Sequence, residues 1–321
     1  MTYIHFIGID VSKDSFEVAF SHAEEVDGSP SAKPRRFANS RQGFAEFLSL
    51  WDTEWSQTFV VLEATGGYEM GLLLALCDDR IAVHRLQPLQ SSHYMRSLRM
   101  YAKTDMLDAM ALARYGAERH AQLAVFKPDD ASTHALKTLQ TRREDLIAIR
   151  VAETQRLKHP LYKDLQDSLQ VILSVVQAEI NVIEIKMNAI VTKESSLAKK
   201  MEVLLAFKGI GSVTALVLLA SLPEIGTLTR KQVASLAGLA PHPKDSGKYT
   251  GYRATKGGRS SLRKALFMAA LSAKRYNPTL REFFDRLVKN GKKPIVALVA
   301  VMRKMIVIIN AQIRDTLFAK T

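Results

Sequence analysis

Asp105 and Asp108 lie three residues apart, a spacing at which two carboxylates could bind a metal ion together. They lie in the stretch 103–108 (KTDMLD), just before an apolar run at 109–115 that predicts a helix. Residues i and i+3 share one helix face, so the two carboxylates would repel each other if they were buried together. A hard divalent cation such as Mg²⁺, bound through oxygen, would offset that repulsion. The alternative is a solvated helix start, where the helix dipole favours aspartate.

Two further acids stand at the ends of predicted strands. An apolar run at 3–9 (YIHFIGI) ends at Asp10, and a second at 58–62 (TFVVL) ends at Glu63. Other strands are predicted at 16–20, 36–39 and 81–86, and helices near 42–50 and 69–78. This order predicts a mixed α/β sheet, whose sites form where strands end. A ribonuclease-H-like sheet would bring both acids to the aspartate pair, as a two-metal site that clamps a scissile phosphate.

A competing interpretation is an actin-like ATPase or sugar kinase, in which GIDVSKDSFEVAF at 8–20 would be a phosphate-binding turn. That class needs a second glycine-rich phosphate loop, and the chain has no convincing second copy and no GxxxxGK[ST] stretch. The pair Gly66-Gly67 is better interpreted as a tight strand-to-helix turn.

Charge is distributed unevenly along the 321 residues. The net charge is +13, yet residues 241–321 hold 18 Lys and Arg against 4 Asp and Glu, so the first 240 residues are close to neutral. Such an excess favours a polyanionic partner, most often nucleic acid. With one cysteine, Cys77, no intramolecular disulfide is possible. We expect no signal peptide and no membrane span of roughly 18 apolar residues, and therefore a cytoplasmic protein.

The middle of the chain, 131–200, has an almost continuous helical pattern that is interrupted near 159–160. Apolar residues recur there at spacings of three and four, namely Leu165, Leu169, Ile172, Val176, Ile180, Ile183, Met187 and Ile190. This heptad-like seam predicts either an ordinary amphipathic helix on a core or a coiled-coil arm that joins protomers or domains.

The basic C-terminal region contains candidates for nucleic-acid binding. The stretch 208–211 (KGIG) between two apolar helices resembles a helix-hairpin-helix element, in which glycines let backbone N–H groups approach a phosphate. The alternative is a helical turn without a ligand. The candidate residues are Lys208, Gly209, Gly211, Lys248, Arg253, Lys256, Arg259, Arg263 and Lys264.

A serine in this region, Ser246, lies in an Asp-Ser-Gly turn surrounded by cations and has no helix nearby to cap. By contrast, Ser260 or Ser261 is expected to cap the next helix. A serine hydroxyl is a weak nucleophile until a base or a metal activates it. No His and Asp pair at helpful spacing accompanies Ser246, so metals bound by the acids are the candidate activators.

Taken in order along the whole chain, six motifs resemble the DEDD transposases of the insertion sequence 110 family, a group that includes the Piv/MooV-type site-specific DNA invertases. The motifs are GIDVSK, VLEATGGY, KTDMLDA, KGIG, GLAPHPKDSGKYTG and GGRSSLRKALFMAA. One departure is the loop after the serine, which reads GKYTG rather than a serine-rich run.

The resemblance implies a RuvC-like catalytic domain at 1–130, a helical coiled-coil spacer at 131–200 and a basic helical transposase domain at 201–321. Asp10, Glu63, Asp105 and Asp108 would bind Mg²⁺, in all two ions, and Ser246 would form a phosphoserine link to DNA. The expected partners are double-stranded DNA, a structured bridge RNA, and further copies of the chain in a homodimer or homotetramer. The alternatives are a metal-dependent nuclease or junction resolvase, an invertase without a guide RNA, and a non-enzymatic nucleic-acid-binding protein.

Overall fold

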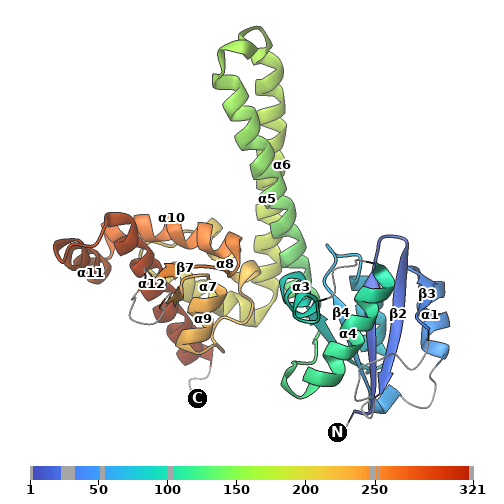
Figure 1. Cartoon of the computed structure of the whole chain (residues 1–321). Helices are drawn as coiled ribbons and strands as arrows, with labels where there is room; N and C mark the ends of the chain where they lie inside the picture. Colours follow the sequence, from blue (N-terminus) through green and yellow to red (C-terminus); the bar gives the residue numbers. More distant parts are fainter. Residues whose placement is uncertain are drawn as a thin grey trace. The chain divides into compact units, whose positions relative to one another are not determined.

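The chain folds into two compact units, 1–128 and 129–321 (Figure 1). The computed structural model describes residues 3–22, 33–50, 55–99, 104–243, 245, 251 and 253–317. The three-domain division, with boundaries at 130 and 200, stays a proposal.

A five-stranded mixed sheet is the centre of the first unit, in the order β3-β2-β1-β4-β5. The strands are β1 His5–Val11, β2 Ser15–His22, β3 Arg35–Ala38, β4 Thr58–Glu63 and β5 Ala82–Leu86. Strands β1, β4 and β5 are parallel, whereas β2 is antiparallel to both β1 and β3. This confirms the predicted α/β class with its ribonuclease-H-like mixed sheet.

Side chains alternate between the two faces of this sheet because the strand repeat is two residues. The α-helices in the described part of this unit are α1 Arg41–Ser49, α2 Met70–Asp78, α3 Pro88–Ser97 and α4 Asp105–Arg119. One face packs Ile7 and Ile9 of β1 with apolar residues of α1 and α2. The other face packs Phe6 of β1 and Val61 of β4 with Leu112 of α4. Helix α4 therefore covers the face opposite to α1 and α2.

Helix α4 crosses β1 in direct backbone contact. A Cβ atom on Gly8 would lie 2.1 Å from both the Ala109 carbonyl oxygen and the Ala113 nitrogen. A Cβ atom on Gly116, further along α4, would lie 3.1 Å from Val61 and 3.6 Å from Phe6. As α4 proceeds, its contacts on β1 move back from Gly8 to Phe6. The helix thus runs antiparallel to β1, and its first turn lies at the carboxyl ends of β1 and β4.

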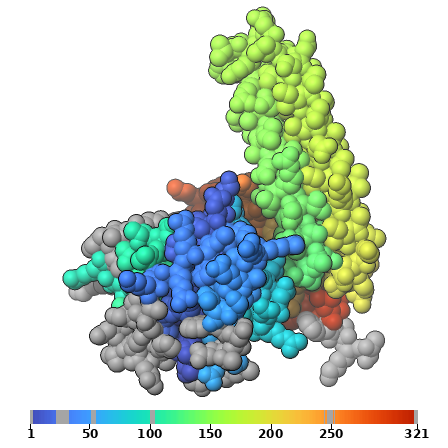
Figure 2. All heavy atoms as spheres, turned by 90° about the vertical axis from the view of Figure 1, so that its right-hand side faces the viewer, coloured from blue at the N-terminus to red at the C-terminus, as the bar shows by residue number. Residues whose placement is uncertain are grey.

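The second unit is helical, which confirms the predicted all-α class. Helices α5 Ala131–Lys158 and α6 Gln166–Lys193 form an antiparallel pair, drawn green to yellow in Figures 1 and 2. The remaining helices are α7 Ser195–Ala206, α8 Ser212–Ser221, α9 Arg230–Leu236, α10 Ser260–Tyr276, α11 Pro278–Lys289 and α12 Pro294–Leu317. A short strand pair, β6 Pro241–His242 and β7 Ala254–Thr255, lies between α9 and α10.

The apolar seam predicted in the middle of the chain lies on the α6 face that packs against α5. Leu169, Val176, Ile180, Ile183 and Met187 are buried there, whereas two predicted members, Leu165 and Ile172, are exposed. The first of these lies in the 3₁₀ turn Pro160–Leu165, before α6 begins, and Leu173 next to Ile172 is half-buried. A role of this helix pair in joining protomers stays a proposal.

Two helical stretches, Pro160–Lys193 and Pro294–Leu317, have the length and apolar composition of a membrane span. A core helix of a globular protein passes the same test, and α12 is such a helix. Its side chains Val301, Met305 and Ile309 are fully buried in the main core of the second unit.

The contact between α4 and β1 predicts the effect of enlarging Gly8. We expect Gly8→Ala to lower the free energy of unfolding of the first unit by about 1–3 kcal/mol, because the new methyl group meets backbone atoms. Urea unfolding measures this change. Gly71→Ala in α2 is the control, since its Cβ would meet the movable Phe44 ring at 3.2 Å and alanine favours a helix. Equal stabilities of the two variants would contradict the prediction.

Candidate functional site

Asp10 and Glu63 lie side by side on the sheet face that α4 covers. Asp10 follows Gly8 by two residues, and Glu63 follows Val61 by two, so both acids project toward the α4 side. In the parallel register Ile9 pairs with Leu62, and the two acids come next on their strands. Neighbouring strands are about 4.8 Å apart, so the strand order places these carboxylates next to each other.

Asp105 and Asp108 occupy the first turn of α4, as the sequence predicted. The turn is capped by Thr104, whose hydroxyl accepts from the Leu107 nitrogen at 3.2 Å. Asp105 is exposed, whereas Asp108 is buried, with an exposed fraction of 9%. Because α4 runs antiparallel to β1, this turn lies at the strand ends that carry Asp10 and Glu63. The fold thus brings the four predicted acids to one edge and one face of the sheet.

This arrangement has the donor chemistry that a hard cation requires. Four carboxylates from two strand ends and one helix start surround the same edge, and carboxylate oxygens are the usual protein ligands of Mg²⁺. Among the residues that the structure describes, no three His, Cys, Asp or Glu side chains lie close enough together to hold a metal ion. The placement of the acids therefore fits a metal site, while their side chains are not gathered into one.

A fifth acid, Glu17, was not among the predicted site residues. It pairs with Asp10 in the antiparallel register of β1 and β2, on the face where Ala19 contacts α4. Arg36 lies 3.6 Å from its carboxylate. The alternation of SFEVAF at 15–20 contained this signal, because it places Glu17 on the same face as Ala19.

The Glu63 carboxylate has a hydrogen-bond donor that the sequence did not reveal. Ser91 of α3 is 3% exposed, and its hydroxyl donates to Glu63 Oε2 at 2.5 Å. Ser91 is 28 residues away in the chain, so this contact depends on the parallel pairing of β5 with β4 and on the start of α3 just after β5.

The turn that follows Glu63 is held from inside by Glu69. Its Oε2 atom accepts from the backbone nitrogens of Thr65 at 3.0 Å and Gly67 at 2.9 Å. Its Oε1 atom accepts from Arg85, with Nε at 3.0 Å. Burial alone would raise the pKa of Glu69, but the Arg85 guanidinium and the backbone donors outweigh burial and hold that pKa below its usual value. The predicted tight Gly66-Gly67 turn is therefore fastened by a fully buried carboxylate that pairs with the half-buried Arg85.

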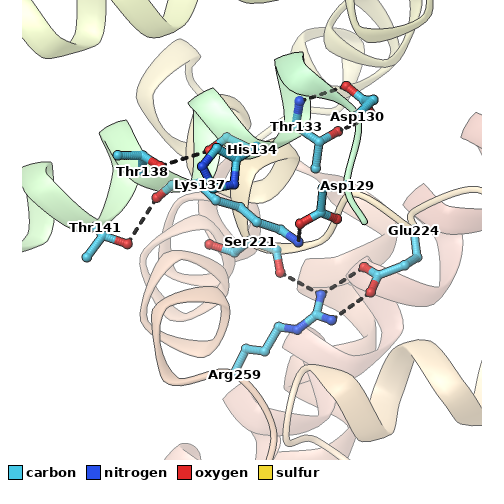
Figure 3. Close-up of polar contacts among 10 residues, drawn as sticks. All are labelled: Asp129, Asp130, Thr133, His134, Lys137, Thr138, Thr141, Ser221, Glu224 and Arg259. Atoms are coloured by element: carbon cyan, nitrogen blue, oxygen red, sulfur yellow. Dashed lines mark hydrogen bonds and ion pairs between the residues drawn. The ribbon is translucent and has the colours of Figure 1, made fainter. Parts of the chain in front are cut away.

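In the second unit, the predicted nucleic-acid contact Arg259 is engaged within the protein (Figure 3). Its guanidinium donates to both Glu224 oxygens, at 2.8 and 2.6 Å, and to the Ser221 carbonyl at 2.8 Å. The hydrogen bonds that Arg259 donates to the Glu224 carboxylate raise the pKa of Arg259. Arg259 thus joins the segment after α8 to the start of α10, and we assign it to holding the fold.

Near this pair, the start of α5 is fixed by its own polar contacts. The Asp130 carboxylate caps the helix by accepting from the Thr133 nitrogen at 2.8 Å, and Lys137 pairs with Asp129 at 2.6 Å (Figure 3). Burial lowers the pKa of Lys200, whose Nζ donates to the Pro223 carbonyl at 2.9 Å. The first two contacts therefore fix the start of α5, and the Lys200 bond joins α7 to the segment after α8.

The glycines of the KGIG stretch differ in what they contact. A Cβ atom on Gly209, whose φ is +113°, would lie 2.6 Å from the Ala273 side chain, so close packing against α10 already requires glycine there. Gly211 has open space around its Cα atom and directly precedes α8. Of the two predicted phosphate-facing glycines, Gly211 is the one with room for a ligand.

The other predicted nucleic-acid contacts vary in their surroundings. Lys208, Arg253, Lys256 and Lys264 are exposed, whereas Arg263 is half-buried and donates to the Gly257 carbonyl at 2.9 Å. Ser246 and Lys248 lie outside the described residues. The neighbouring Asp245 accepts from the Gly251 nitrogen at 3.2 Å.

The prediction that Ser260 or Ser261 caps α10 was wrong. Ser260 and Ser261 are the first residues of the helix, and Arg259 occupies the cap position without a side-chain cap bond. The physical reason is tertiary, because the Arg259 nitrogen donates to the Leu236 carbonyl and its side chain binds Glu224.

The pair between the buried Glu69 and the half-buried Arg85 predicts a stability change and its pH dependence. We expect Arg85→Ala to lower the free energy of unfolding of the first unit by about 3–5 kcal/mol, because it leaves a buried carboxylate unpaired. The lowered pKa of Glu69 means that the wild-type contribution is complete above about pH 4.5 and is lost as pH falls through the folded-state pKa.

Urea unfolding from about pH 7 to about pH 3 measures both effects, and Glu69→Gln should reduce the loss of stability in acid. The control is Arg114→Ala, which breaks the exposed pair with Glu118 and should change the free energy of unfolding by less than about 1 kcal/mol. Equal losses for the two arginine variants would contradict the prediction.

Comparisons with known proteins agree with these features. A family model described as Transposase, of the DEDD insertion sequence 110 type, matches residues 7–163, and one described as Transposase IS116/IS110/IS902 family matches 201–285. The pilin gene-inverting proteins of Moraxella bovis and Moraxella lacunata are each 30% identical over 322 residues, which span 97% of this chain and 96% of theirs.

Among solved structures, Thermus thermophilus RuvC in complex with a Holliday junction substrate matches 39% of this chain and 100% of its own, with 13% identity and a TM-score of 0.30. The fold of the first unit is defined by its strand order and pairing and does not depend on that likeness. The two family models and the full-length relatives are decisive, and the chain belongs to the IS110 family of transposases and recombinases, enzymes that cut DNA.

Proposed function

We propose that this chain cuts and rejoins DNA with two Mg²⁺ ions held by Asp10, Glu63, Asp105 and Asp108, and with Ser246 as nucleophile. The observation that carries the metal proposal is the common edge of β1, β4 and α4, where all four acids lie. The buried Asp108 adds to it, because a cation would offset the cost of burying a carboxylate at this edge.

Each residue has a defined task in this proposal. When bound, Mg²⁺ would supply charge neutralisation at the scissile phosphate and would favour ionisation of an attacking hydroxyl. Asp10 and Glu63 offer oxygen ligands from a rigid sheet, and the two aspartates of α4 offer them from a capped first turn. Rigid supports of this kind keep ligands in register while the DNA binds.

The serine step conserves the energy of the broken bond. The Ser246 oxygen attacks phosphorus, the bond from phosphorus to a DNA sugar oxygen breaks, and that oxygen leaves with the proton that the serine loses. The phosphoserine ester persists until a DNA hydroxyl attacks it, which rejoins the strands and restores the serine. No ATP is needed. Support for Ser246 comes from its APHPKDSG sequence context and the family resemblance.

The partners follow from charge and family. Residues 241–321 carry the excess of Lys and Arg, which suits double-stranded DNA and a structured bridge RNA. We also propose a homodimer or homotetramer joined through the α5–α6 pair, and a cytoplasmic location.

Site-specific inversion without a guide RNA is a second candidate. It is favoured by the match of nearly full length to pilin gene-inverting proteins. Sequencing the RNA and DNA that co-purify with the protein distinguishes the two candidates, because a structured RNA of single sequence supports guidance and its absence supports the invertase.

The metal proposal predicts the effect of neutralising each acid. We expect Asp10→Asn, Glu63→Gln, Asp105→Asn and Asp108→Asn each to reduce Mg²⁺-dependent DNA cleavage to background, because each removes an anionic ligand. The matched control is Asp14→Asn, an exposed acid in the turn after β1, which should keep wild-type cleavage. Full Mg²⁺-dependent cleavage by any of the four variants would remove that residue from the site.

The nucleophile proposal predicts a covalent adduct that depends on Ser246. With end-labelled DNA, the wild-type protein should yield a protein–DNA band on a denaturing gel, whereas Ser246→Ala should yield none. Ser260→Ala, in the first turn of α10, is the matched control and should form the adduct. An adduct from Ser246→Ala would disprove the assignment, and its absence from the wild type would favour a nuclease or junction resolvase.

A further inference from the structure

We infer that Ser91 is a positioning residue that holds the Glu63 carboxylate ready for a divalent metal ion. The inference rests on the proposed function, since it takes Glu63 as a metal ligand. Its basis is one contact between two elements, the hydrogen bond of 2.5 Å from the buried Ser91 hydroxyl to Glu63 Oε2. A bond this short is typical of a hydroxyl that donates to an ionised carboxylate.

These two residues lie together because β5 pairs with β4 and α3 begins just after β5. Glu63 pairs with Leu86 at the end of β5, and the Ala64 nitrogen donates to the Leu86 carbonyl at 2.9 Å. Helix α3 begins two residues later at Pro88, whose fixed φ suits a first helical position. Ser91, one turn into α3, therefore lies beside Glu63.

The direction of the Ser91 proton follows from its two acceptors. The hydroxyl lies 2.5 Å from Glu63 Oε2 and 3.0 Å from the Pro88 carbonyl oxygen, and it has one hydrogen to donate. An ionised carboxylate has no hydrogen of its own, so it accepts at the closer contact. The Pro88 carbonyl is the alternative acceptor when the carboxylate is absent, so the buried hydroxyl still has a hydrogen-bond partner.

Holding one oxygen restricts a flexible ligand. A glutamate side chain has three rotatable bonds, and a ligand that must be ordered when the ion arrives binds it more weakly. With Oε2 bonded to Ser91, the carboxylate keeps one orientation before any ion binds. Hydrogen bonds to metal ligands of this kind typically change metal affinity or activity by about 10- to 100-fold.

The backbone around Glu63 is fixed by other contacts. Its strand pairs on both sides with β1 and β5, and the turn after it is fastened by Glu69. Removing the Ser91 hydroxyl therefore frees the Glu63 side chain and leaves the strand in place. This separates a positioning role from a merely structural one, because metal affinity should fall while the melting temperature stays close to that of the wild type.

The test compares Ser91→Ala and Ser91→Thr with a matched control in the same helix. Ser97 also lies in α3, and its hydroxyl donates to the carbonyl three residues before it, Tyr94 O at 2.6 Å, but it contacts no carboxylate in the described structure. Binding of Mn²⁺ to the full-length protein without DNA is measured by isothermal titration calorimetry. DNA cleavage against Mg²⁺ concentration and thermal unfolding are measured on the same preparations.

We expect Ser91→Ala to weaken Mn²⁺ binding by about 10- to 100-fold and to shift half-maximal cleavage to higher Mg²⁺. At saturating Mg²⁺ its cleavage should approach the wild-type rate. Ser91→Thr keeps the hydroxyl and should restore Mn²⁺ affinity, while Ser97→Ala should match the wild type. If Ser91→Ala fails to fold, Ser91→Cys carries the same expectation, since its size is similar and its S–H is a weak donor.

Two results would overturn the inference. In the first, Ser91→Ala keeps the wild-type Mn²⁺ affinity while Glu63→Gln loses it. The proposed metal site would then exist without needing the Ser91 hydroxyl. The other is equal weakening in Ser91→Thr and Ser91→Ala at unchanged melting temperature, which excludes the hydroxyl as the cause. Wild-type Mn²⁺ binding and cleavage in Glu63→Gln would instead refute the proposed role of Glu63 itself.

Discussion

The backbone contact of α4 with β1 at Gly8 is the constraint on which the candidate site depends. Because no side chain separates the helix from the strand there, α4 has one depth and one direction over the sheet. That direction places its first turn at the ends of β1 and β4. Without it, Asp105 and Asp108 would be an ordinary acidic helix start with no relation to Asp10 and Glu63.

A set of polar contacts then supports the acids from behind. Ser91 bonds the carboxylate of Glu63, and the Glu69–Arg85 pair fastens the turn that follows it. Buried polar groups need partners, and here the partners come from α3 and β5, which themselves flank β4. The same contacts that satisfy buried groups thus also fix the ligand side chain that the proposed metal would bind.

The second unit shows why a basic sequence overstates a binding surface. Arg259 is committed to Glu224, Arg263 to a carbonyl, and Gly209 to packing against α10. The exposed Lys208, Arg253, Lys256 and Lys264 remain available for a polyanion. Residue types therefore indicated a polyanionic partner, while tertiary contacts decided which of the cations are held within the protein.

The sequence by itself determined the features that depend on local chemistry and order along the chain. These are the alternation that buries β1 and β4, the capped helix start that holds both aspartates, the helical second half and the motifs of the family. Each is readable because strand and helix periodicity is a short-range property. The chain order of the acids, at two strand ends and one helix start, also predicted that they would lie at one edge of the sheet.

Only the tertiary structure decided which side chains act on one another across long separations. Ser91 with Glu63 and Arg259 with Glu224 are 28 and 35 residues apart, and no local pattern links them. The cap of α10 was mispredicted for the same reason, since a long-range ion pair and a backbone bond displaced the expected serine. Hydrogen bonds between buried groups are set by which elements pack together, and packing is decided by the whole fold rather than by neighbouring residues.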